Sequence, residues 1–149
     1  MSVLPYDPGP LPTLPAPAPG ESLDLVIDGY PPFKDVKQSI RNRQHPRHGD
    51  FKTLRDAAIK AMAGRAWYFG PVGLDLALYA PSLPPNRSLL DYVGGVMDTL
   101  DGSSGCTFTF LPIVYEDDCQ VALGNMRFFE SQTVHYSLKV TFLAERPAN

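Results

Sequence analysis

Residues 71–102, PVGLDLALYAPSLPPNRSLLDYVGGVMDTLDG, contain the strand and the helix around which the fold can be built. Over 71–79, three leucines alternate with other residues, which is the pattern of a half-buried β-strand. A proline-rich loop follows at 81–87. Over 90–100, apolar side chains recur every three or four positions, as on the buried face of a helix. This stretch therefore predicts a strand, a loop and a helix in succession.

The flanking sequence supplies the other elements. Residues 22–27 (SLDLVI) alternate like a short strand, and residues 51–63 carry an apolar stripe at helical spacing. Two further patterns, at 120–129 and 133–143, are typical of strands, and residues 130–132 between them predict a hairpin turn. The order of elements is βαβαββ, so the sequence predicts an α+β domain in which two helices pack on one face of a small mixed sheet.

The N-terminal segment has a different composition. Residues 1–20 contain seven prolines, which predicts a disordered tail ahead of a single domain over 21–145. Such a tail can also be a polyproline ligand for a partner, so an adaptor is one alternative function. No apolar run approaches the ~20 residues that a membrane helix needs, and no secretory signal is visible. We therefore expect no membrane partner and a cytoplasmic location.

Acidic side chains gather in 91–118, a stretch without lysine or arginine. Carboxylates without counter-charges repel one another, and a folded protein tolerates them at a surface or where a cation or proton neutralises them. The stretch therefore predicts a divalent metal site for magnesium or manganese, and the alternative is a solvated acidic turn. Its acidic residues are Asp91, Asp98, Asp101, Glu116, Asp117 and Asp118.

Two adjacent glycines lie inside the helix expected over 90–100. Gly94 and Gly95 each cost ~1 kcal/mol relative to alanine, so a helix interior that holds both needs a reason. Close approach of another backbone, a subunit or a phosphate chain is one explanation, and ordinary packing of the helix on a strand is the other.

Positive charge is concentrated upstream of the acidic stretch. Residues 34–65 hold nine Lys or Arg against three Asp, a net charge of +6 in a chain whose net charge is −3. This asymmetry predicts that one half of the domain binds a polyanion. The alternative is a solvated helix face beside a basic loop.

Several short motifs resemble the RusA-type Holliday junction resolvases. DTLDG at 98–102 is similar to the end of a helix in that family, and DDCQV at 117–121 is similar to its second acidic motif. Upstream, YPP at 30–32, the basic loop and the Phe-x-x-x-Arg-Asp pattern at 51–56 resemble the family's N-terminal half. The resemblance covers roughly residues 23–143.

The sequence departs from this family at the first acidic motif. The family's Asp-x-Asp-Asn falls on residues 88–91, so Ser88 and Leu90 stand where two metal ligands are expected. The family's lysine falls on Gly94. The resemblance carries Asp118 over as a metal ligand. It implies either a divergent active site or a degenerate one that keeps the fold and DNA binding.

The family implies a homodimer that cleaves four-way DNA junctions with magnesium, by metal-activated water. On this reading a one-residue shift lets Asp91 act as the metal ligand of the first acidic motif. Asp91 and Asp118 are then catalytic, and Lys37 or Arg87 supplies the positive charge of the family's lysine. The alternative is a RusA-like fold that binds DNA or has a structural role without catalysis. The expected metal ligands are Asp91, Asp98, Asp117 and Asp118. The expected DNA-binding residues are Lys37, Arg41, Arg43, Arg47, Lys52 and Arg55.

Overall fold

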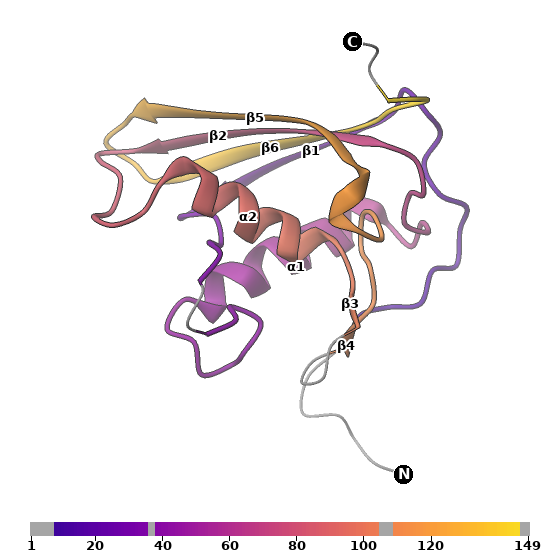
Figure 1. The fold of residues 1–149 in the computed structure, drawn as a ribbon, viewed down its shortest axis with the longest axis horizontal. Helices are drawn as coiled ribbons and strands as arrows, with labels where there is room; N and C mark the ends of the chain where they lie inside the picture. Colours follow the sequence, from indigo (N-terminus) through magenta and orange to yellow (C-terminus); the bar gives the residue numbers. More distant parts are fainter. Residues whose placement is uncertain (1–7, 36–37, 105–108, 147–149) are drawn as a thin grey trace.

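A computed structural model describes residues 8–35, 38–104 and 109–146 of the chain (Figure 1). The domain is α+β, with a four-stranded mixed sheet and both helices on one face of it, as the sequence predicts. The elements are β1 (Ser22–Asp28), α1 (His48–Met62), β2 (Val72–Ala80), α2 (Leu89–Leu100), β3 (Ser103–Ser104), β4 (Thr109–Phe110), the short 3-10 helix η1 (Asp118–Gln120), β5 (Val121–Glu130) and β6 (His135–Phe142).

The order of strands across the sheet is β1-β6-β2-β5. β6 pairs antiparallel with β1 and β2, and β2 pairs parallel with β5. The expected hairpin between β5 and β6 is therefore wrong, because β2 lies between these strands. Their connection crosses the end of β2, where the Ser131 amide donates to the Ala80 carbonyl at 2.9 Å. A hairpin would leave β2, the most deeply buried strand, with an unpaired edge.

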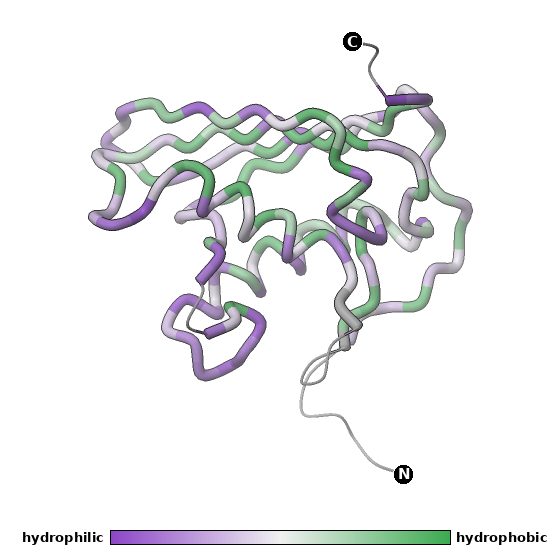
Figure 2. Tube along the Cα trace, in the orientation of Figure 1, coloured by the Kyte–Doolittle hydropathy of each residue, from purple (hydrophilic) through white to green (hydrophobic). Residues whose placement is uncertain are grey.

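The layers form because each element has one apolar face. β1 buries Leu23, Leu25 and Ile27, and α2 contributes Val96 and Leu100 to the same core. Figure 2 shows apolar and polar residues alternating along the strands, whereas the loop that precedes α1 is largely hydrophilic. Burial of apolar surface between the two layers is the main stabilising contribution to such a fold.

Packing requires glycine at one of the two glycine positions of α2. A Cβ on Gly95 would lie 2.2 Å from the carbonyl oxygen of Pro32 and 2.5 Å from the Cα of Phe33, so only glycine allows this approach. Gly94 faces the stem of Lys34, whose Cβ would lie 3.2 Å from an added methyl group. Close approach of another backbone, one of the two explanations considered, is confirmed for Gly95, and that backbone is the loop after β1.

The part of the N-terminal segment that the structure describes, residues 8–20, lies against the domain. The amides of Thr13 and Leu14 donate to the carbonyl of Gly64 at 2.9 and 3.0 Å. Since an extended proline-rich segment has no internal hydrogen bonds, its amides are available to such partners. Residues 8–20 therefore have backbone partners on the domain, residues 1–7 lie outside the described residues, and disorder of the segment stays a prediction.

Candidate metal centre

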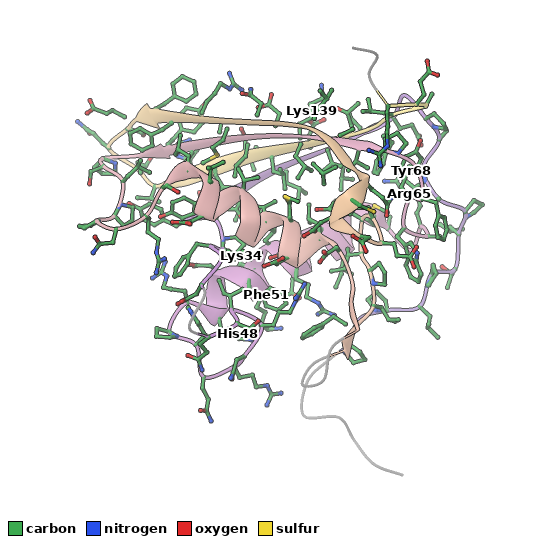
Figure 3. The ribbon with its side chains drawn as sticks, in the orientation of Figure 1. Lys34, His48, Phe51, Arg65, Tyr68 and Lys139 are labelled. Atoms are coloured by element: carbon green, nitrogen blue, oxygen red, sulfur yellow. The ribbon has the colours of Figure 1, made fainter. Side chains whose placement is uncertain are left out.

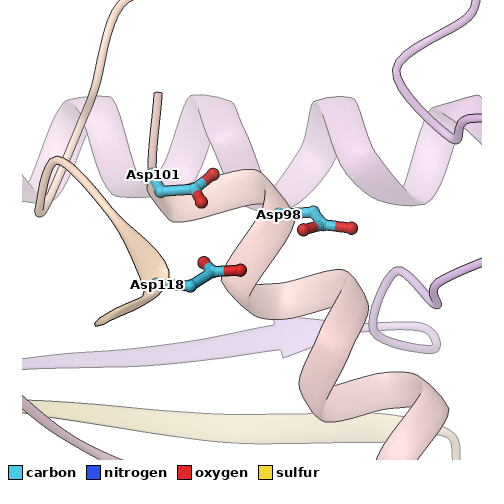
Figure 4. A group of neighbouring side chains, drawn as sticks. All are labelled: Asp98, Asp101 and Asp118. Carbon is cyan, nitrogen blue, oxygen red and sulfur yellow. The ribbon is translucent and has the colours of Figure 1, made fainter. Parts of the chain in front are cut away.

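Three aspartates meet at the C-terminal end of α2. Asp98 and Asp101 lie three residues apart at the helix end, and Asp118 opens η1. One oxygen from each carboxylate lies within 4.8 Å of the other two. Figure 4 shows the three side chains together beside the last turn of α2. This spacing allows all three to bind one divalent ion at metal–oxygen lengths of about 2.0–2.6 Å. We call these residues the acidic cluster.

The segment that carries Asp118 is fixed by a capping network. The Asp117 side chain accepts a hydrogen bond from the Cys119 amide at 3.0 Å. Gln120 Oε1 accepts from the Asp117 amide at 3.0 Å, and Gln120 Nε2 donates to the Tyr68 carbonyl at 2.7 Å. Asp117 and Gln120 therefore hold η1 in place, and Asp118 is left to face α2.

The end of α2 is anchored to the segment that leads into η1. The Leu100 carbonyl accepts from the amides of Ile113 and Val114, at 3.2 and 3.1 Å. The Gly102 amide donates to the Glu116 carbonyl at 3.3 Å. These backbone bonds join parts of the chain that are distant in sequence. These backbone bonds therefore bring the acidic residues together even though their carboxylates repel one another.

Protein charges neutralise the acidic cluster only in part. A terminal nitrogen of Arg41 lies 2.9 Å from Asp101 Oδ1 and also donates to the Asp98 carbonyl. Burial, followed by a hydrogen bond with Asp118 and repulsion from it, still raises the pKa of Asp101 to about 9. Burial also raises the pKa of Asp98, against the charges of Arg41 and Lys34, which lies beside α2 (Figure 3). One guanidinium therefore does not balance three carboxylates.

Asp118 presents an oxygen that no fixed donor satisfies. Its Oδ1 is buried and accepts no hydrogen bond from the part of the chain that the structure describes. Asp101 can donate to Asp118 only when Asp101 is protonated, which is the state favoured by its raised pKa. An unsatisfied buried acceptor costs about 1–3 kcal/mol. The site therefore suits a shared proton or a cation, and carboxylate oxygens are ligands that magnesium and manganese prefer.

Two of the expected metal ligands, Asp91 and Asp117, lie outside the acidic cluster. The Asp91 carboxylate accepts from the Ser88 amide at 3.0 Å in a capping box at the start of α2. The Asp117 carboxylate caps η1 through the Cys119 amide. A carboxylate at a helix start stabilises the helix through its unpaired amides. Both residues thus have structural roles in the absence of any ion.

The other two expected ligands, Asp98 and Asp118, belong to the acidic cluster. Asp101 completes it, although sequence reasoning did not include it among the ligands. The signal in the sequence is its distance of three residues from Asp98, which brings two side chains to the same face of a helix.

A cationic cavity adjoins the acidic cluster through Arg41. It encloses about 150 Å³ beside the start of α1, where Figure 3 shows His48 and Phe51. The rings of Phe51 and Phe110 form its apolar part, with centroids 5.6 Å apart. The Arg55 guanidinium lies 5.1 Å from the centroid of the Phe110 ring. Its polar lining residues are Arg41, Arg43, His48, Lys52 and Arg55, and none of the described lining residues is acidic.

The structure brings four of the six expected DNA-binding residues to this cavity. They are Arg41, Arg43, Lys52 and Arg55. Arg47 instead pairs with Asp50 at 2.8 Å and lines a second cavity. Lys37 lies outside the described residues. Arg87, the other cation expected at the metal site, lies over the ring of Phe33 near the start of α2, so Arg41 is the arginine that contacts the acidic cluster.

No protein-family model and no curated protein sequence matches the chain. The resemblance to the RusA-type resolvases therefore rests on the motifs described above. None of the helices in the described ranges has the length and apolar character needed to span a membrane.

Proposed function

We propose that the chain is a divalent-metal-dependent endodeoxyribonuclease that acts on branched DNA, such as four-way junctions, in the cytoplasm. The observation that carries this proposal is the double contact of Arg41, which pairs with the acidic cluster and also lines the cationic cavity. A metal site beside a phosphate site is the arrangement that metal-assisted phosphodiester hydrolysis needs. The resemblance to RusA-type resolvases supplies the substrate class.

In this proposal Asp98, Asp101 and Asp118 hold magnesium or manganese. A bound ion would polarise the scissile phosphate and lower the pKa of an attacking water. Arg41 supplies a fixed positive charge at the border of the two sites. It takes the place of the lysine that the resemblance leads one to expect at Gly94.

The cationic cavity provides contacts to the DNA backbone. Arg43 and Lys52 are exposed on its rim, and Arg55 lies within it. Phosphate contacts of this kind position DNA without reading its sequence, and they make affinity strongly dependent on salt. Selectivity for branched DNA would therefore come from the shape of the substrate and not from its sequence.

A non-catalytic DNA-binding protein on the same fold is the second candidate. The observation that favours it is the bond between Arg41 and Asp101, because a cation of the chain already neutralises part of the acidic cluster. A proton shared by Asp101 and Asp118 would then replace the metal ion. The adaptor alternative has less support, since residues 8–20 of the proline-rich segment lie against the domain.

We further propose a homodimer, as the resemblance implies. Among the described strands, β5 pairs on one side only, and such an unpaired edge can pair with a strand of a second copy of the chain. Light scattering across a range of protein concentrations measures the mass of the particle. A monomer throughout that range would contradict this part of the proposal.

Cleavage of a synthetic four-way junction tests the main proposal, with a linear duplex as the control substrate. We expect cleavage with magnesium, none with EDTA, and none by Asp98→Asn or Asp118→Asn. The matched control is Asp91→Asn, which alters a carboxylate of the same helix outside the acidic cluster and should leave cleavage intact. Junction binding without cleavage by the wild-type chain, under every divalent ion tried, would favour the second candidate.

A further inference from the structure

A second cavity lies between the starts of the two helices, at the end of α2 opposite the acidic cluster. It encloses about 340 Å³, which lies within the range of small-molecule sites. Two prolines of the loop before α2 form part of its wall. Its other lining residues are Tyr30, Phe33, Tyr92, Arg47, Arg87 and Asp50.

The aromatic side of the cavity is a packed group of rings. Tyr30 and Tyr92 stack with centroids 6.3 Å apart, and Phe33 meets Tyr92 edge-on at 6.5 Å. The Tyr30 hydroxyl donates to the Ser82 carbonyl at 3.2 Å, which ties the ring to the loop before α2. Mutual packing therefore fixes the rings. Phe33 and Tyr92 are only 8% and 2% exposed, so the partly exposed Tyr30 presents the ring surface that a planar ligand can reach.

The cavity also carries positive charge. The Arg87 guanidinium lies 3.6 Å from the centroid of the Phe33 ring, and it forms no ion pair with any residue that the structure describes. Asn86, just before it, adopts φ +65°, a left-handed conformation that asparagine tolerates better than most residues. On the opposite wall, Arg47 is paired with Asp50 at 2.8 Å. The cavity therefore has an uncompensated guanidinium beside an aromatic surface.

Hydrogen-bonding groups complete the lining. Burial raises the pKa of the Tyr92 hydroxyl to about 12, so this group is a neutral donor at physiological pH. Asp50 offers a carboxylate acceptor at the same cavity. A flat ring with polar edges and an attached anion has the features that match this lining, and a nucleotide has all of them.

We propose that this cavity binds a nucleotide, with its base on the Tyr30 ring and its phosphate at Arg87. The nucleotide would be an unstacked nucleotide of the branched DNA on which the chain acts, and this part of the inference rests on the proposed function. Tyr92 and Asp98 are six residues apart on one helix, about 9 Å at 1.5 Å per residue. The bound base therefore lies within a few nucleotides of the acidic cluster.

Binding of single-stranded DNA by the full chain tests this proposal in EDTA, where neither metal nor cleavage takes part. The probes are a short fluorescein-labelled strand and a strand of equal length that contains only abasic sites, compared by fluorescence anisotropy. Since stacking of a base on aromatic rings strengthens binding, we expect the wild type to prefer the base-bearing strand by roughly tenfold. Both strands carry the same phosphates, so contacts at the cationic cavity cancel in this ratio.

Tyr30→Ala should reduce the preference to about twofold or less, whereas Arg87→Ala, which removes the proposed phosphate contact, should weaken binding of both strands and leave the ratio unchanged. The matched control is Arg127→Ala, which removes another arginine that lies over a phenylalanine ring, on β5 away from the cavity. Arg87→Lys keeps the charge and loses the planar contact, so its affinity for both strands should lie between those of the wild type and Arg87→Ala. It tests the phosphate contact if Arg87→Ala does not fold. A wild type without any preference, a Tyr30 variant that keeps it, or an Arg87→Ala variant with unchanged affinity for both strands would overturn the proposal.

A free deoxynucleoside monophosphate distinguishes the two sources of the ligand. We expect it to compete weakly with the labelled strand. Competition at the affinity of the strand would support a nucleotide site and reject DNA as its source. Asp118→Asn should lose cleavage and keep the base preference, because the preference needs no metal. This result would show that nucleotide binding at the cavity and metal-dependent cleavage can be tested independently.

Discussion

Alanine at Gly95 should destabilise the domain, whereas alanine at Gly94 should not. At Gly95 the added methyl carbon would lie 2.2 Å from the Pro32 carbonyl oxygen, inside any allowed contact. Relief requires a shift of the loop backbone or of α2, and such overpacking typically costs about 1–3 kcal/mol. Replacement of glycine inside a helix returns about 1 kcal/mol of helix propensity. We therefore expect a net loss of up to about 2 kcal/mol for Gly95→Ala.

Gly94→Ala is the matched control, since it adds the same methyl group one residue away. Its nearest neighbours are Lys34 Cβ and Cδ, at 3.2 and 3.3 Å, on an exposed and flexible side chain. A few tenths of an ångström of movement relieve this contact, so the gain in helix propensity exceeds the cost of the contact. We expect between no change and a gain of about 1 kcal/mol.

Equilibrium urea unfolding followed by circular dichroism measures the difference between the two variants. If the slopes of the transitions agree, the shift in midpoint reports the change in stability. We expect the Gly94→Ala midpoint to lie clearly above that of Gly95→Ala. Equal midpoints, or the reverse order, would refute the close approach of the loop after β1 to α2, and with it the position of Phe33 in the second cavity.

Stability should depend on pH, because the folded, metal-free chain holds a proton on Asp101 up to about pH 9, whereas the unfolded chain releases it near the ordinary carboxyl pKa of 3.8. The free energy of unfolding should thus fall as pH rises between these values, and Asp101→Asn should remove most of this slope in urea titrations at several pH values. Asp91→Ala should cost about 1 kcal/mol, measured by thermal unfolding, because it removes a helix cap without touching the acidic cluster. Arg43→Ala should weaken DNA binding and lower the slope of log affinity against log salt by about 1, and an unchanged slope would remove Arg43 from the DNA interface.

The elements of the fold were predictable because they depend on local patterns. The apolar periodicities of residues 51–63 and 90–100 gave both helices to within three residues at each end. The order of strands was not predictable in the same way, since a turn at residues 130–132 fits both a hairpin and a crossing over β2. Pairing of β2 with β5 is a long-range property that appears in neither strand's own sequence.

The acidic cluster was predictable as a concentration of charge and not as a set of ligands. Asp91 and Asp101 look alike in sequence, because each is an aspartate at an end of the same helix. Their difference arises from η1, which brings Asp118 to the C-terminal end of α2. The proline content of residues 8–20 likewise does not reveal their backbone partners, because those partners come from distant parts of the chain.

The position of β6 has a consequence for biosynthesis. Among the described strands, β1 is the first and pairs only with β6, the last, with Ser22 opposite Thr141. A growing chain on the ribosome therefore cannot complete this sheet until β6 has emerged, and until then the apolar side of β1 has no strand beside it. Contacts of such long sequence separation slow folding and prolong exposure of aggregation-prone surface. We expect the nascent chain to need protection by a chaperone for most of its synthesis, and any truncation ahead of β6 to yield insoluble protein.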